Sequence, residues 1–65
     1  MNLTANPRAI LSRRKTAGLT RTQLSVKAGV SMTTIHYAEN FGVVSPATAA
    51  KLAAVFHCAT KDLLP

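Results

Sequence analysis

The side chains of this sequence that could hold a metal or carry out acid–base and nucleophilic chemistry are few: His36, Glu39, His57, Cys58 and Asp62. Only His57 and Cys58 are adjacent, and a third or fourth zinc ligand is missing. The two acids do not form a catalytic pair. No nucleophile is accompanied by a base and an orienting partner, and no glycine-rich phosphate loop is present. We therefore expect no enzyme activity, no metal and no other cofactor.

The charge of the chain indicates a different kind of partner. Eight Lys and Arg residues against two acids give a formal net charge of +6, which favours a polyanion such as nucleic acid or an anionic membrane surface. A merely solubilising surface is the alternative. No apolar run approaches the ~20 residues of a membrane span, and the start "MNLTANPRAI" lacks the features of a signal peptide. A single cysteine excludes an intrachain disulfide, so we expect a cytoplasmic protein.

A chain of 65 residues forms one domain with a small core. Asn6 can cap free backbone N–H groups, and Pro7 supplies a preset first helical residue. The first helix is therefore expected from there to about Thr16. Residues 1–5 remain as a short N-terminal arm before a domain of residues 6–65.

Two short helices follow, and a single glycine separates them. Thr20 and Gln23 have the spacing of a capping box, which predicts the start of the second helix. Gly29 ends that helix within about two and a half turns. Ser31 can then cap a third helix, "SMTTIHYAEN".

The C-terminal third of the chain carries two further helix signals. Ser45 caps and Pro46 opens a fourth helix through about His57, and Thr60 can cap a last short turn that ends before Pro65. No alternating strand pattern is present. The prediction is an all-α, compact five-helix bundle without strands, whose expected core is Ile10, Leu19, Leu24, Val30, Ile35, Leu52, Phe56 and Leu63.

Two short helices joined by a three- to four-residue turn that contains a glycine are typical of a helix-turn-helix. Gly29 takes the turn position, where a positive φ would strain any side chain. Leu24, Val30 and Ile35 would hold the two helices at a fixed angle. A helical hairpin inside any small bundle could also use such a glycine, but the apolar spacing and basic charge favour the helix-turn-helix.

The segment "GLTRTQLSVKAGVSMTTIHYAEN" resembles the helix-turn-helix of the phage repressor and Cro-type (XRE) family. The flanking "RAILSRRKTA" and "SPATAAKLAAVFHCATKDLL" resemble the first, fourth and fifth helices of that family, so that the resemblance covers residues 7–64. It implies a lambda repressor-like DNA-binding domain. Ser25 departs from the usual alanine, and its hydroxyl fits if it bonds back to a carbonyl. Phe41 replaces the glycine usual after "EN", with Gly42 one place later.

The resemblance also implies which residues face DNA. The outward, base-reading positions of the third helix would be Ser31, Met32, Thr33, His36 and Tyr37. Arg21, Thr22 and Gln23 begin the second helix, where backbone N–H groups and the helix dipole favour a phosphate. Asn40 would cap the third helix or bond a phosphate. Arg14 and Glu39 occupy positions of a structural ion pair between the first and third helices.

Relatives of this type commonly bind as twofold dimers. The candidate dimer interface is Val43, Val44 and Leu64, which are expected to remain exposed. The predicted function is a sequence-specific double-stranded DNA-binding transcriptional regulator, a phage or plasmid-type Cro or repressor that acts as a homodimer on a palindromic operator. Alternatives are an autoregulating antitoxin and a protein-interaction module without DNA binding. No small-molecule ligand is evident, and interrupted apolar stripes disfavour a membrane-surface peptide.

Overall fold

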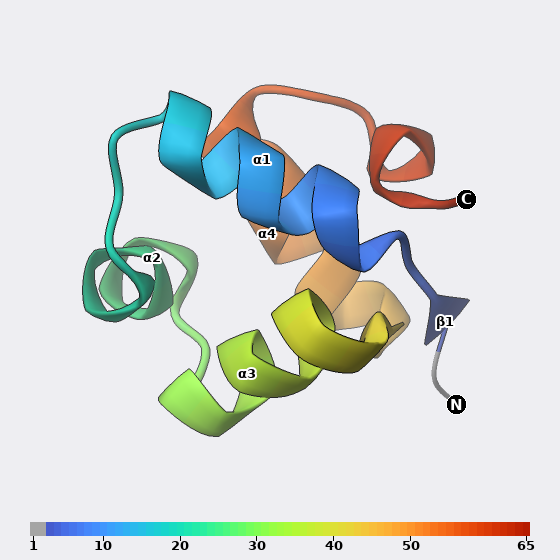
Figure 1. Cartoon of the computed structure of the whole chain (residues 1–65), viewed down its shortest axis with the longest axis horizontal. Helices are drawn as coiled ribbons and strands as arrows, with labels where there is room; N and C mark the ends of the chain where they lie inside the picture. The colour runs from blue at the N-terminus through green and yellow to red at the C-terminus, as the bar shows by residue number, and fades with distance from the viewer. Residues whose placement is uncertain (1–2) are drawn as a thin grey trace.

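The computed structural model describes residues 3–65 as a mostly helical fold (Figure 1). Its elements are β1 (Leu3–Thr4), α1 (Pro7–Thr16), α2 (Arg21–Ala28), α3 (Met32–Phe41), β2 (Val43–Val44), α4 (Pro46–Phe56) and the 3-10 helix η1 (Thr60–Leu63). Within this described part, no helix combines the length and the apolar character that crossing a membrane requires.

The four α-helices begin where their capping residues predict. In each case the side-chain oxygen of the cap accepts a hydrogen bond from a backbone N–H in the first turn, which satisfies a donor that has no partner inside the helix. The caps are Asn6, Thr20, Ser31 and Ser45. The capping box is complete, since Gln23 Oε1 in turn accepts from the backbone N–H of Thr20 at 2.8 Å.

The predicted fifth helix is wrong. Residues Thr60–Leu63 form a single 3-10 turn, so that the described residues contain four α-helices and not five. Ala59, rather than Thr60, occupies the position before the turn, and its backbone N–H donates to Asp62 Oδ2 at 3.0 Å. Four residues are too few for an α-helix to repeat its i→i−4 bonds, whereas the tighter 3-10 pattern suits short pieces.

The expectation of no strands is also wrong. β1 and β2 pair antiparallel, with Leu3 opposite Val44 and Thr4 opposite Val43. Ala5, which continues from β1, is 2% exposed and donates its N–H to the carbonyl of Gly42 at 2.7 Å. Residues 3–5 of the predicted arm are therefore tied to the chain that follows α3, while residues 1–2 lie outside the described residues.

The core lies between the four α-helices and η1, with α1 packed against α3, and α2 packed against both α3 and α4 (Figure 1). Its fully buried large side chains are Ile10, Leu24, Ile35, Leu52 and Leu63. The other three predicted core residues, Leu19, Val30 and Phe56, pack partly buried against this cluster. Burial of these apolar side chains removes them from water and is the main force that holds α3 in place.

Candidate nucleic-acid interface

Gly29 sets the direction in which α3 leaves α2. It adopts φ +70° and ends α2 with its N–H donating to the carbonyl of Ser25 at 2.9 Å. The N–H of Val30 donates to the same carbonyl at 3.1 Å. Because a Cβ at Gly29 would meet no atom within 4 Å, the glycine is required for its left-handed conformation and not for space.

The hydroxyl of Ser25 bonds back to the carbonyl of Thr22 at 3.0 Å. This is the contact that the sequence required if serine was to replace alanine here. Its polar side chain is therefore satisfied within its own helix.

The helix α3 has one buried face and one exposed face. Ile35 and Ala38 are 0% exposed, and together with Glu39 they anchor the helix in the core. The predicted base-reading residues all lie on the exposed side, which we call the outer face of α3: Ser31, Met32, Thr33, His36 and Tyr37. A shallow cleft runs along the outer face and is lined by Arg21 and four of these residues. The start of α2, where Arg21 lies, is therefore next to the outer face.

Arg21, Thr22 and Gln23 are all exposed in the first turn of α2, where free N–H groups and the helix dipole attract anions. The carbonyl oxygen of the Gln23 side chain is already engaged in the capping box. Its amide NH₂ is thus the end of the side chain that can donate to a phosphate.

Glu39 holds α1, α2 and α3 together through two arginines. Arg14 Nε lies 2.6 Å from Glu39 Oε2 and Arg14 Nη2 lies 3.1 Å from Oε1, a bidentate arrangement at the position where the family resemblance places an ion pair. Arg14 Nη1 also donates to the carbonyl of Leu19 at 2.9 Å. Arg21 Nε approaches Glu39 Oε1 at 3.3 Å. The Glu39 side chain is 1% exposed, so its charge is almost wholly balanced within the protein.

A sequence model of the family described as Helix-turn-helix matches residues 10–63. The chain belongs to the XRE-type helix-turn-helix family. Members of this family are DNA-binding transcriptional regulators and not enzymes. A comparison with curated protein sequences finds no match.

The structures of two other proteins are among the solved structures that share this helix-turn-helix fold. The first is a crystal structure of SinR, the master regulator for biofilm formation, in complex with DNA. The match has a TM-score of 0.83 and 26% sequence identity, and it covers 91% of this chain and 100% of the SinR chain. The second is the restriction-modification controller protein C.AhdI from Aeromonas hydrophila, with a TM-score of 0.79, 22% identity and coverage of 89% of each chain. The second likeness shows the fold alone.

The end of α3 in this helix-turn-helix differs from the expectation. Gly42, with φ +69°, occupies the C-cap position, so α3 extends through Phe41 and Asn40 is not the cap. Asn40 Nδ2 instead lies 2.9 Å from the carbonyl oxygen of His36 and 3.2 Å from His36 Nδ1. Phe41 is 61% exposed and adds a large apolar side chain to the surface at the end of α3.

The three candidate dimer residues of the helix-turn-helix domain do not share one environment. Val43 is 42% exposed and Leu64 is half-buried, but Val44 is only 2% exposed and belongs to the core. The prediction that Val44 remains exposed and belongs to the dimer interface is therefore wrong. Successive side chains of a strand point to opposite sides, so β2 directs Val43 outward and Val44 inward.

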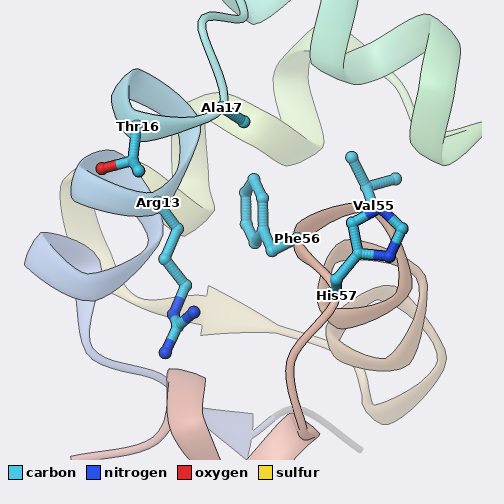
Figure 2. A pocket seen from close by; sticks show the side chains of 6 residues that line it. All are labelled: Arg13, Thr16, Ala17, Val55, Phe56 and His57. Carbon is cyan, nitrogen blue, oxygen red and sulfur yellow. The ribbon is translucent and has the colours of Figure 1, made fainter.

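A second hollow lies between the C-terminal ends of α1 and α4 (Figure 2). Its lining residues are Arg13, Thr16, Ala17, Val55, Phe56 and His57. None of them comes from α2 or α3, so Arg13 is placed at this hollow and does not line the cleft along the outer face.

Among residues 3–65 no three histidine, cysteine or acidic side chains gather as metal ligands would.

Proposed function

We propose that this chain is a sequence-specific double-stranded DNA-binding transcriptional regulator, a Cro-type repressor of the phage or plasmid kind that acts as a homodimer on a palindromic operator. The observation that carries the proposal is the division of α3 into two faces. Ile35 and Ala38 are fully buried, while the residues of the outer face lie together on the surface. A helix anchored on one side and open on the other can enter a major groove.

Charge and neighbouring groups support this proposal. The net charge of +6 matches the polyanionic backbone of DNA. The exposed first turn of α2 stands next to the outer face, because Arg21 lines the same cleft as Met32 and His36. SinR, which covers most of this chain, was crystallised in complex with DNA.

The outer face supplies polar and apolar contacts of modest strength. Thr33 offers a hydroxyl to a base or a methyl group to thymine, and Met32, which is 44% exposed, suits a thymine methyl. The side chains that make bidentate contacts to guanine or adenine, Arg, Asn and Gln, do not occur among these five residues. Specificity then depends in part on DNA shape and on the geometry of two half-sites.

Selection of bound sequences from random duplex DNA at near-physiological salt tests the proposal. We expect a palindromic motif. Thr33→Ala and Met32→Ala should each change the preferred base at single positions of that motif, because each contact to a base contributes about 1–3 kcal/mol of discrimination. Arg21→Ala is expected to weaken binding to all sequences alike and to lower the salt slope by about one. Val26→Ala, at a 77% exposed position of α2, is the control. Failure to enrich any sequence, or affinity that is insensitive to salt, would favour a protein-interaction module.

The homodimer is proposed to form through the exposed apolar residues around β2. Phe41 and Val43 are exposed and close in sequence to each other, and the half-buried Leu64 is the remaining candidate from the sequence. Exposed apolar side chains that gather in this way mark interaction surfaces.

Val43→Asp is therefore expected to raise the dimer dissociation constant at least tenfold, because it places a charge in an apolar contact (about 1.4 kcal/mol or more). Sedimentation equilibrium measures the change, with Val26→Asp as the matched substitution on another surface. If Val43→Asp sediments like the wild type and still binds the operator cooperatively, the interface lies elsewhere.

A further inference from the structure

We infer that Asn40 fixes the imidazole of His36 in the tautomer that carries its proton on Nε2, so that the outer face of α3 presents a single N–H donor suited to guanine. The first half of this inference concerns the free protein. The second half rests on the proposed function, since it needs α3 to lie in a major groove.

The hydrogen bonds of Asn40 decide the tautomer. Its amide nitrogen lies 2.9 Å from the carbonyl oxygen of His36. A carbonyl oxygen can only accept, so the NH₂ end of the amide must face it. The same nitrogen lies 3.2 Å from His36 Nδ1, and its second hydrogen is available to that atom. Nδ1 then accepts, and a neutral imidazole with an accepting Nδ1 carries its proton on Nε2.

Neighbouring rings hold the imidazole in this orientation. Tyr37 meets it edge-on, with centroids 5.5 Å apart and an interplanar angle of 74°, and Phe41 does so at 6.1 Å and 79°. The spacing of four residues between His36 and Asn40 places both on the same side of α3. Within residues 3–65, no protein group accepts a hydrogen bond from His36 Nε2. Its N–H is therefore a donor that is held in place and open to a ligand.

The chemistry of base edges indicates what this donor would select. In the major groove guanine presents two adjacent acceptors, N7 and O6, whereas adenine places a donor amino group beside N7 and cytosine presents a donor amino group. Thymine presents one acceptor, O4, beside its methyl group, so guanine offers a single fixed N–H donor the largest set of acceptors. In this arrangement Asn40 acts by positioning His36, which differs from the phosphate contact or cap expected from the sequence.

NMR of the free protein tests the tautomer without DNA. In a long-range ¹H–¹⁵N correlation at a pH where the ring is neutral, we expect His36 Nδ1 at the position of an unprotonated nitrogen and Nε2 at that of a protonated one. Asn40→Ala should move both signals towards the positions of a histidine that exchanges freely between its two tautomers. A protonated Nδ1 in the wild type, or signals that do not respond to Asn40→Ala, would overturn the inference.

A double-mutant cycle tests the reading of DNA. On the operator selected by the wild type, exchange of one G·C pair for A·T is expected to lower affinity about three- to tenfold, the effect of one net hydrogen bond. His36→Ala should abolish that preference and Asn40→Ala should reduce it. Asn40→Ala should have no further effect when His36 is already alanine, because the two residues act as one unit.

The alternative outcomes separate the two proposals. If Asn40→Ala lowers affinity for every sequence in both backgrounds, Asn40 binds a phosphate and the inference is overturned. If an operator is selected but His36→Ala changes no base preference on it, this inference is overturned while the proposed function stands. If no duplex is selected at all, the proposed function fails too, although the NMR result on the tautomer still stands.

Discussion

Gly42→Ala is expected to lower the free energy of unfolding by about 3 kcal/mol, one of two strong effects that the fold predicts. Gly42 has φ +69°, and a side chain in this left-handed region costs roughly 1–2 kcal/mol. A Cβ there would also overlap the carbonyl oxygen of Ala5 and press on Pro7 Cδ. Relief of that overlap requires β1 to move away from the end of α3, which adds about 1–3 kcal/mol.

Denaturant unfolding measures this effect, and Gly29→Ala is its control. Gly29 has nearly the same φ, +70°, but a Cβ at that position meets nothing within 4 Å. The control variant is therefore expected to lose only the conformational part, about 1 kcal/mol. Equal losses in the two variants would show that the close approach of Ala5 to Gly42 contributes nothing to stability.

Glu39→Gln is expected to destabilise the fold by a similar amount, about 3 kcal/mol. The Glu39 side chain is 1% exposed and faces two guanidinium groups, of which that of Arg14 is itself only 13% exposed. A neutral amide in this place leaves the charge of Arg14 poorly compensated inside the protein. An unpaired buried charge is among the most costly changes a fold can suffer.

Two further variants separate this effect from a general sensitivity to mutation. Arg21→Ala removes the more distant and 43% exposed partner and is expected to lose less than about 1 kcal/mol. Replacement of Arg14 and Glu39 together by methionine removes both buried charges, and this pair should be more stable than Glu39→Gln alone. Thermal or urea unfolding gives these differences directly. A value for Glu39→Gln within about 0.5 kcal/mol of the wild type would contradict the argument.

The helices could be predicted from the sequence because their signals are local. Thr20 and Gln23 cap one helix between themselves, and Ser31 and Ser45 each begin another within a single turn. The pairing of β1 with β2 could not be predicted in this way. Each strand has two residues, too short for an alternating pattern, and its partner lies in a distant part of the chain.

The candidate site shows the same division between local and long-range information. Helical periodicity and the resemblance to known repressors were enough to place Met32, Thr33 and His36 on the surface. The burial of Val44 depends on the direction in which β2 pairs with the N-terminal residues. The contact of Arg21 with Glu39 depends on the angle between α2 and α3, which sequence spacing does not fix. The sequence did offer one signal for it, since Glu39 is the only acid in residues 1–61.

The carboxylate shared by three helices has a consequence for the thermodynamics of association. A surface arginine ordinarily samples many rotamers, and ordering such a side chain on binding costs about 0.5–1.5 kcal/mol. Arg21 is already restrained by Glu39, while its side chain stays 43% exposed to water. When Arg21 binds an anion in this conformation, its side chain therefore loses little rotational entropy. More of the favourable electrostatic energy is then available as binding affinity.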